Sequence, residues 1–199
     1  MLYLLRHGET EWNRVGRRQG RGDSPLTALG RRQAAACGEV LKREITDISQ
    51  ALMLTSPLGR ARATAEIVRV VLGLSEERVR VLDCLAEQDM GEWQGLSNRG
   101  VDERFPGARA RRDKDKWNYV IPGGESAAMV HQRLLPWLRS CREDRTTVVV
   151  AHEVVSRMIR GIYLALDPAE TLKLDHSHGR IYRLSQGEVT TIDAAVDLA

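Results

Sequence analysis

Apolar runs and helix-like periods alternate along the chain, which predicts strands that alternate with helices. A continuous apolar run is typical of a buried strand, whereas apolar residues three and four positions apart are typical of an amphipathic helix. The runs that predict strands cover residues 1–5, 48–55, 79–82 and 146–151. The periods that predict helices cover residues 27–43, 59–72, 126–142 and 153–164. The run TTVVVA is the most strongly β-branched in the chain and therefore predicts a central strand.

The C-terminal part of the chain predicts a β-hairpin. Residues 181–184 and 189–192 are strand-like, and the four residues between them, Ser-Gln-Gly-Glu, predict the turn. Because strands alternate with helices before this hairpin, the predicted fold class is α/β: a single-domain three-layer α/β/α sandwich with a mostly parallel central sheet. A chain of 199 residues can bury a core of its own, so one domain over residues 1–199 is expected.

Residues 85–124 interrupt the alternation. They contain six Gly and a charged block at 109–116, and they predict only one short helix near 97–105. A long irregular segment inside a compact domain is usually functional, often as a lid over a site. Four aromatic side chains in or beside it need a surface to pack on, namely Trp93, Phe105, Trp117 and Tyr119. We therefore expect residues 94–124 to form a substrate-cap insertion.

The charge balance adds one unusual feature. The 30 basic and 27 acidic residues leave a net charge of +3, but 26 of the basic residues are Arg and only four are Lys. Arg binds phosphate bidentately, which suits nucleic acid or a small phosphorylated ligand. Simple replacement of surface Lys by Arg accounts for most of them without a function. Because the basic residues are spread along the chain, nucleic acid is not an expected partner.

Cysteine usage and apolar run lengths bear on the compartment. Three cysteines without CxxC spacing predict neither a disulfide framework nor a zinc site, so a reducing cytoplasm is the expected location. No apolar run approaches the roughly 18 residues of a membrane helix, so no membrane partner is expected. The N-terminal apolar run meets Arg6 at once and lacks a preceding basic region, which is unlike a signal peptide.

Chemically reactive side chains follow the predicted strands, at the ends where α/β proteins bind ligands. Arg6 and His7 follow the first strand, and Arg60 opens the helix after the second. His152 ends the central run, and Glu87 follows the third run by a few residues. If these strands are neighbours, two guanidiniums, two imidazoles and one carboxylate meet at one edge of the sheet. Such a set predicts a site for a dianion.

This set could carry out phosphoryl transfer. Two guanidiniums neutralise the charge of a phosphoryl group, and helix N-termini add backbone N–H donors. A neutral imidazole, such as that of His7, is a competent nucleophile toward phosphorus. The leaving alkoxide then needs a proton, which Glu87 can donate if its surroundings raise its pKa.

With these residues the chain resembles the histidine phosphatase superfamily, the phosphoglycerate-mutase-like family. Five segments in order, together covering nearly the whole chain, carry the resemblance: Arg6-His7-Gly8-Glu9-Thr10 with Trp12-Asn13, Gln19-Gly20 and Ser24-Pro25-Leu26-Thr27; Ser56-Pro57-Leu58-Gly59-Arg60-Ala61; Leu85-Ala86-Glu87 with Gly91 and Trp93; Pro122-Gly123-Gly124-Glu125-Ser126; and Val149-Val150-Ala151-His152. The match implies a phosphatase of the histidine acid-phosphatase type, a phosphoric monoester hydrolase.

The resemblance also implies a role for each residue. His7 is the expected nucleophile, which becomes phosphohistidine, and Glu87 is the expected acid, which protonates the leaving oxygen and then deprotonates water. The residues expected at the phosphoryl group or substrate are Arg6, Asn13, Gln19, Gly20, Arg60 and His152. The family needs no metal, and the sequence contains none of the common metal motifs, so neither a metal site nor a cofactor is expected. His176 and His178 fall where the family often makes backbone contacts, and His131 is expected at the surface.

One position departs from the family pattern. The family usually has Gly directly after the second His, whereas this chain has Glu153. The carboxylate could pair with an Arg, or it could point away along the following helix and favour the helix dipole. We expect the second arrangement.

Three functions stay open at this point. A phosphatase is favoured over a phosphoglycerate mutase because the segment after the acid motif is compact, and a non-catalytic phosphate-binding domain has no need of both nucleophile and acid. The expected partner is a small phosphorylated metabolite, and a homodimer is left open. Residues 104–119 would form the cap, with Arg104, Arg109, Arg111 and Arg112 shaping it. The sequence does not choose among sugar phosphates, nucleotides and ribazole-type phosphates.

Overall fold

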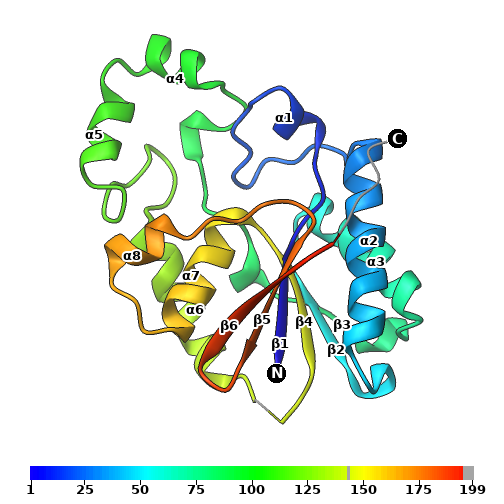
Figure 1. Cartoon of the computed structure of the whole chain (residues 1–199). Coiled ribbons are helices and arrows are strands. Elements are labelled where there is room, and N and C mark those ends of the chain that lie inside the picture. The colour runs from blue at the N-terminus through cyan, green and yellow to red at the C-terminus, as the bar shows by residue number, and fades with distance from the viewer. Residues whose placement is uncertain (143, 195–199) are drawn as a thin grey trace.

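The computed structural model describes residues 1–142 and 144–194 and contains one six-stranded sheet of strand order β3-β2-β4-β1-β5-β6 (Figure 1). The strands are β1 (Leu2–Arg6), β2 (Leu52–Thr55), β3 (Val79–Val81), β4 (Thr147–Ala151), β5 (Arg180–Ser185) and β6 (Glu188–Asp193). The first four pair in parallel, whereas β5 runs antiparallel to β1 and β6 antiparallel to β5. The predicted mostly parallel sheet with a C-terminal hairpin is confirmed.

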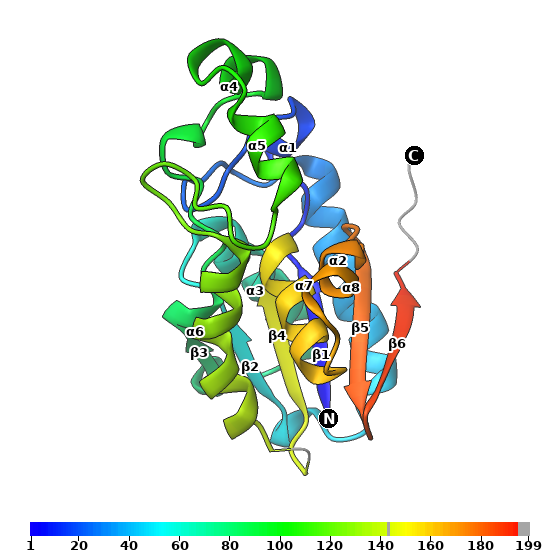
Figure 2. The same cartoon turned by 90° about the vertical axis from the view of Figure 1, so that its left-hand side faces the viewer.

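Helices cover both faces of this sheet and its upper edge (Figures 1 and 2). They are α1 (Glu11–Arg14), α2 (Ala28–Glu44), α3 (Gly59–Leu72), α4 (Asn98–Arg104), α5 (Ala108–Lys114), α6 (Ala127–Ser140), α7 (Glu153–Tyr163) and α8 (Pro168–Lys173). Helices α2 and α3 lie on one face, and α6 and α7 on the other. This is the predicted three-layer sandwich.

The central strand β1 shows how the sequence builds the two layers. Tyr3 and Leu5 pack into the cluster formed with α2 and α3, whereas Leu2 and Leu4 pack into the cluster formed with α6 and α7. Successive side chains of a strand point to opposite faces, and both faces are covered here, so all four residues are buried. That is why the strand is a continuous apolar run rather than an alternating one.

Two local predictions were wrong. Residues 48–51 do not belong to the second strand: Ile48–Gln50 form a 3₁₀ turn, and the strand begins at Leu52. Ser49 in this turn is exposed and donates to Asp47, so local polar contacts outweigh extension of the strand. The C-terminal hairpin has a two-residue loop, Gln186 and Gly187, because Ser185 already pairs with Glu188. Both loop residues have positive φ, of 52° and 78°, as a type I′ turn requires.

Three helices were not predicted. Helix α1 is a single turn whose N-cap, Thr10, accepts a hydrogen bond from the Asn13 backbone N–H. Helix α5 lies inside the charged block, and α8 follows Leu166. The last has a clear local signal, because Asp167 caps it in a capping box with Glu170 and proline occupies its first turn.

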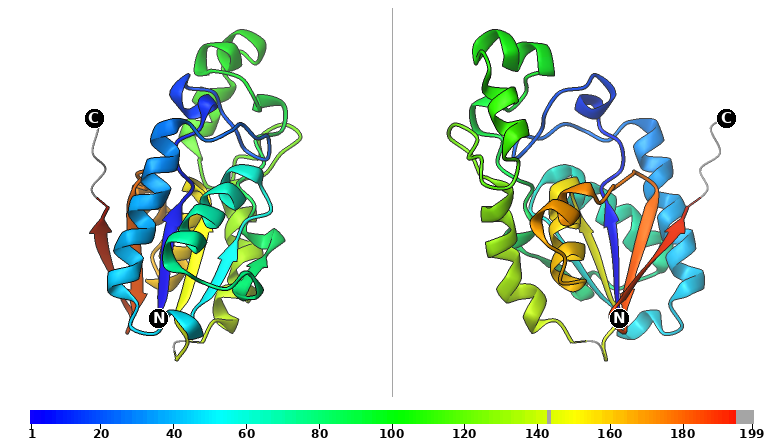
Figure 3. Two further views of the ribbon diagram at one scale, coloured as in Figure 1. Left: turned by 90° about the vertical axis from the view of Figure 1, so that its right-hand side faces the viewer. Right: turned by 60° about the vertical axis from the view of Figure 1, so that its left-hand side comes forward.

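Residues 94–124 lie over the end of the sheet where the parallel strands finish, with α4 and α5 beside the loop that carries α1 (Figures 1 and 3). Together with Trp93 they form a small core, made of Trp93, Val101, Ala108 and Ile121 with Phe105 and Tyr119 packed against it. The expectation that these aromatic residues pack is therefore met. None of the helices in the ranges that the structure describes has the length and apolar character needed to cross a bilayer.

Candidate active site

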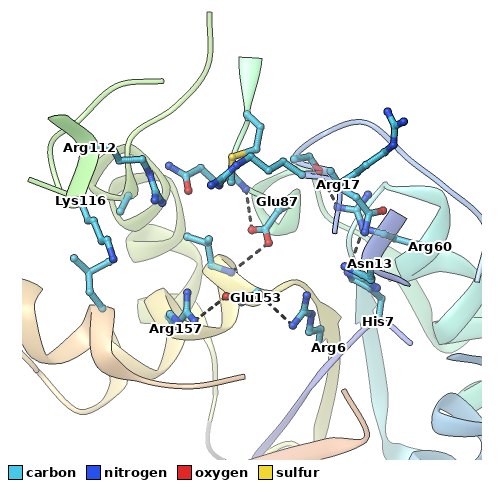
Figure 4. Close-up of a pocket in the computed structure, with 18 residues that line it drawn as sticks. Arg6, His7, Asn13, Arg17, Arg60, Glu87, Arg112, Lys116, Glu153 and Arg157 are labelled. Carbon is cyan, nitrogen blue, oxygen red and sulfur yellow. Dashed lines mark hydrogen bonds and ion pairs between the residues drawn. The ribbon is translucent and has the colours of Figure 1, made fainter. Parts of the chain in front are cut away.

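A cavity of about 360 Å³ opens at the end of β1, beneath residues 94–124 (Figure 4). Seven of the eight residues predicted for the site line it: Arg6, His7, Asn13, Gln19, Gly20, Arg60 and Glu87. The eighth, His152, is fully buried directly beside His7, with the two ring centroids 5.2 Å apart. Strands β1 and β4 pair in parallel with Arg6 opposite Ala151, so the two histidines leave the sheet together.

The imidazole of His7 is held by both of its nitrogens. Its Nδ1 lies 2.7 Å from the carbonyl oxygen of Gly8, and its Nε2 accepts a hydrogen bond of 3.2 Å from Nε of Arg60. Nδ1 therefore carries the hydrogen, and the lone pair is on Nε2. Burial, followed by the charges of His152, Arg6 and Arg60, holds the pKa of His7 well below its ordinary value. The ring is consequently neutral at pH 7.

Glycine at position 8 lets this turn approach α2. A Cβ on Gly8 would lie only 2.1 Å from the carbonyl oxygen of Gly30, which no real side chain tolerates. The Gly8 N–H also donates to the hydroxyl of Thr64 on α3, at 3.0 Å. The loop after β1 is thus fixed against two helices, and His7 with it.

Arg60 is buried at the start of α3, and its guanidinium has a nearly complete set of acceptors. One terminal nitrogen donates to the carbonyl of Gly22 at 2.7 Å and to Asp23 at 3.1 Å, and the other donates to the carbonyl of Gly20 at 2.7 Å. Gly20 adopts a positive φ of 56°, where glycine is unstrained, and so turns its carbonyl toward the guanidinium. Burial lowers the pKa of Arg60, but an arginine remains charged in proteins.

Asn13 and Gln19 form hydrogen bonds within the segment after β1 that lines the cavity next to His7. The Asn13 side-chain oxygen accepts a hydrogen bond of 3.1 Å from the Thr10 backbone N–H, so its NH₂ group is not used there. Gln19 donates to the Thr10 hydroxyl at 2.7 Å and accepts from Ser24 at 3.4 Å. Both residues line the cavity as predicted, and both also stabilise the loop.

Glu87 lies across the cavity from His7 (Figure 4). One carboxylate oxygen accepts from the backbone N–H of Gln88 at 2.9 Å, and the other accepts from that of Val154, at the N-terminus of α7, at 3.2 Å. Burial is the largest influence on this group and raises its pKa above the ordinary 4.5. Arg133, which sequence reasoning missed, fixes the loop by donating to the carbonyl of Ala86 at 2.6 Å.

Glu153 does not point away from the site, so the expectation for this residue was wrong. One of its carboxylate oxygens lies 3.1 Å from a terminal nitrogen of Arg6, and the other lies 2.7 Å from Arg157 (Figure 4). Arg6 also donates to the carbonyl of His176 at 2.9 Å. Two guanidiniums attract the carboxylate more strongly than solvent does, and it lines the cavity between them.

Of the remaining histidines, only His178 contacts the backbone of His7 within the described ranges. His152 Nε2 lies 2.7 Å from the Ser56 hydroxyl oxygen, and its Nδ1 has no hydrogen-bond partner among residues 1–142 and 144–194. His178 Nδ1 lies 2.8 Å from the carbonyl oxygen of His7, so the expected backbone contact is present. His131 is half-buried and packs against a tryptophan ring, which differs from the expected surface position.

The sequence profile of the histidine phosphatase superfamily (branch 1) matches residues 2–192. The chain belongs to this family. The glucosyl-3-phosphoglycerate phosphatase of Mycolicibacterium vanbaalenii is 39% identical over 163 residues, which cover 76% of this chain and 68% of that protein. Phosphoserine phosphatase 1 of Hydrogenobacter thermophilus is 34% identical over 169 residues, which cover 83% and 77% of the two chains. As a histidine phosphatase with relatives so named, the protein is a phosphoric monoester hydrolase.

Solved structures agree with this assignment. A mycobacterial glucosyl-3-phosphoglycerate phosphatase in complex with VO3 superimposes with a TM-score of 0.78 at 32% identity over 98% of each chain. The α-ribazole phosphatase of Shigella flexneri superimposes with a TM-score of 0.78 at 25% identity, over 97% of this chain and 95% of that one.

In this histidine phosphatase the outer part of the cavity is more basic than predicted. Of the four cap arginines named from the sequence, only Arg112 lines the cavity. Lys116, from the predicted cap segment 104–119, lines it too, as do three cations that were not predicted, namely Arg17, Arg18 and Arg157. Across the described ranges, no group of three or more His, Cys, Asp or Glu is arranged to hold a metal ion.

Proposed function

We propose that the protein is a metal-independent phosphomonoesterase that hydrolyses a small phosphorylated metabolite through a phosphohistidine on His7. The single observation that carries this proposal is the state of His7: a buried, neutral imidazole whose Nδ1–H is held by Gly8 and whose Nε2 faces the cavity beside Arg60. Glu87, across the same cavity, has a raised pKa and serves as the general acid and base.

The phosphoryl group is bound by charge rather than by a metal. Arg6 and Arg60 neutralise its negative charge, and the NH₂ group of Asn13 donates to it. His152 contributes its Nδ1–H in the tautomer whose Nε2 accepts the hydrogen of the Ser56 hydroxyl, 2.7 Å away. The orphaned Nδ1 of His152 supports this role, since a buried polar atom without a partner is costly unless a ligand satisfies it.

The first step transfers the phosphoryl group to His7. The Nε2 lone pair forms the N–P bond while the bond from phosphorus to the leaving oxygen breaks. The leaving oxygen takes that bonding pair together with the proton of Glu87, so it departs as a neutral alcohol. The carbonyl oxygen of Gly8 continues to accept the hydrogen bond from Nδ1–H and thereby stabilises the phosphorylated ring.

The second step returns the protein to its starting state. Glu87, now ionised, takes a proton from a water molecule whose oxygen forms a bond to phosphorus. The N–P bond breaks, its electron pair returns to Nε2, and inorganic phosphate leaves. Residues 94–124 contribute Arg112 and Lys116 to the cavity wall, act as the substrate cap and limit the access of bulk water between the two steps.

Hydrolysis of p-nitrophenyl phosphate in the presence of a chelator tests the proposal. Wild-type protein is expected to release p-nitrophenol, and protein denatured at alkaline pH after incubation with a phosphoryl-labelled ester is expected to carry an acid-labile label on a histidine. His7→Asn should abolish both signals, whereas Arg111→Gln, an exposed residue of α5, should retain both.

Two outcomes contradict the proposal. Interconversion of phosphoglycerates that depends on a bisphosphate primer would identify a mutase. Absence of turnover and of labelled His7 with p-nitrophenyl phosphate and with a panel of metabolite phosphates would identify a phosphate-binding domain.

A further inference from the structure

The outer wall of the cavity holds cations that the proposed reaction does not use. Arg18, from the loop after α1, and Arg112, on α5, both line the cavity together with Lys116. In Figure 4, Arg112 and Lys116 lie beyond Glu153 on the side away from His7. The phosphoryl group, bound next to His7, therefore does not neutralise the charges of Arg18 and Arg112.

Arg112 has an exceptional environment for a charged side chain. Within residues 1–142 and 144–194 its guanidinium has no ion pair and no hydrogen bond, and its Nε is shielded from solvent. The nearby carboxylates are already engaged, because Asp113 is 3.5 Å from the Lys116 ammonium and Glu153 bridges two other arginines. A buried donor without an acceptor is destabilising, so its retention indicates a ligand that supplies the acceptor.

Arg18 shows the same deficit on the opposite segment of the wall. Its Nε is also shielded and has no partner in the part of the chain that the structure describes. One terminal nitrogen donates to the side-chain oxygen of Asn98 at 2.7 Å, and the guanidinium lies 5.4 Å from the centroid of the Trp93 ring. These contacts fix the side chain in place without neutralising it. Arg112 is also close enough for its charge to lower the pKa of Arg18, after burial.

We propose that Arg18 and Arg112, with Lys116, form a second anion-binding subsite, and that the substrates are phosphate monoesters with a second anionic group, a carboxylate or a second phosphate, at the far end. The inference rests on the proposed function of the same site. Glu153 lies between the two cationic groups and repels an anion placed midway, so the two anionic ends of a substrate are held apart.

Matched pairs of esters test this subsite, because each pair differs only in the far group. 3-Phosphoglycerate is compared with glycerol 3-phosphate, and 6-phosphogluconate with glucitol 6-phosphate, so that both a short and a long spacer are covered. Mannitol 1,6-bisphosphate is compared with mannitol 1-phosphate. In at least one pair, wild-type protein is expected to prefer the doubly anionic member by tenfold or more in kcat/KM. Which pair shows the preference distinguishes a carboxylate from a second phosphate.

The variants Arg112→Gln and Arg18→Gln are expected to lower this preference ratio about tenfold, because each removes one charged donor to the far group. The ratio is the readout because a folding defect or a loss of His7 chemistry lowers both members of a pair together. Arg111→Gln is the matched control: it removes a neighbouring charge of α5 that does not line the cavity, and the ratio should stay within twofold.

The outcomes separate this inference from the proposed function. Equal kcat/KM within all three pairs, or an equal loss for both members in Arg112→Gln and Arg18→Gln, would overturn the second subsite while hydrolysis itself stands. Absence of p-nitrophenyl phosphate hydrolysis by the wild-type protein would overturn both.

Discussion

Nε of Arg60 donates a hydrogen bond of 3.2 Å to Nε2 of His7, the atom that we propose as the nucleophile. The bond fixes the ring in the tautomer that can attack, and it also occupies the reactive lone pair in the unliganded protein. An incoming phosphoryl group must therefore take this donor from His7. The remaining bonds from Arg60 to Gly20, Gly22 and Asp23 hold the guanidinium in place, so a small shift is sufficient.

The first prediction concerns Arg60→Lys, which keeps the charge but removes the fork of donors. A lysine ammonium cannot donate to His7 and at the same time reach the carbonyls of Gly20 and Gly22. We expect kcat/KM for p-nitrophenyl phosphate to fall about 100-fold, which corresponds to about 2.7 kcal/mol. Arg62→Lys, at an exposed position of the same helix, should stay within twofold of wild type. Retention of more than a third of the activity by Arg60→Lys would contradict the assignment.

The second prediction separates the acid role of Glu87 from a structural one. Glu87→Gln keeps the shape but has no proton to give, and general acid catalysis typically contributes 10²- to 10⁴-fold. p-Nitrophenolate leaves readily without a proton, whereas an alkoxide does not. The loss in kcat/KM should therefore be at least ten times larger for glycerol 3-phosphate than for p-nitrophenyl phosphate. An equal loss for both esters would indicate that the residue only supports the fold.

The same variant should change the pH profile. Glu87 acts in its protonated form, so kcat/KM for an alkyl ester should decline as pH rises through its raised pKa, and Glu87→Gln should lack this decline. His7 acts in its neutral form, and its pKa lies well below 6.5, so the decline on the acid side should begin only below pH 6.5. A decline that begins above pH 6.5 on the acid side would contradict the neutral state of His7.

The third prediction concerns Glu153, whose carboxylate shares the cavity with the phosphoryl site. Glu153→Gln removes a charge that repels the substrate dianion and that partly neutralises Arg6. The inhibition constant of inorganic phosphate should fall about tenfold, a change of about 1.4 kcal/mol. The charge of Glu153 also raises the pKa of Glu87, so the alkaline decline should move to lower pH.

A matched control for Glu153→Gln is Glu66→Gln, which removes an exposed carboxylate that is also paired with an arginine. It should change neither the phosphate inhibition constant nor the pH profile. Weaker phosphate binding in Glu153→Gln would show that the carboxylate holds Arg6 in position rather than competing with phosphate.

The main site residues could be predicted from sequence because a general rule places them. Parallel strands end at one edge, and the register of β1 and β4 brings Arg6 opposite Ala151, so residues that follow the two strands must meet. Arg60 and Glu87 lie near them because each follows the end of a neighbouring parallel strand, β2 and β3 respectively, by a few residues. The periodicity also fixed α3 to its observed bounds, Gly59–Leu72.

The rest depends on contacts that leave no local pattern. Arg111 and Arg112 are adjacent and chemically identical, and only the packing of α5 directs the second of them into the cavity. The Glu153 side chain is oriented by its ion pairs with Arg6 and Arg157. Arg6 is far from Glu153 in the sequence, so no local pattern indicates this pair. By contrast, α8 could have been found from the capping box of Asp167 and Glu170.

The last prediction concerns the pH dependence of stability. Burial is the main influence that lowers the pKa of four histidines below the ordinary 6.5: His7, His152, His176 and His178, the last to about 4. When the protein unfolds, each regains its ordinary pKa and binds a proton below pH 6.5. The unfolded state then binds more protons than the folded state, so the free energy of unfolding must fall as pH decreases from 6.5.

Each neutral histidine contributes up to about 1.4 kcal/mol per pH unit to the slope of the unfolding free energy against pH in this window. The folded pKa of Glu87 is raised, so Glu87 contributes a slope of the opposite sign that corresponds to at most one proton. Urea unfolding at pH 5, 6 and 7 measures the sum. His178→Gln, which keeps a donor for the carbonyl of His7, should reduce the slope by about one proton. His131→Gln, at a half-buried site outside the cavity, should change it less. A free energy of unfolding that stays constant or rises between pH 7 and pH 5 would mean that these rings are already charged in the folded protein, and a charged His7 could not attack phosphorus.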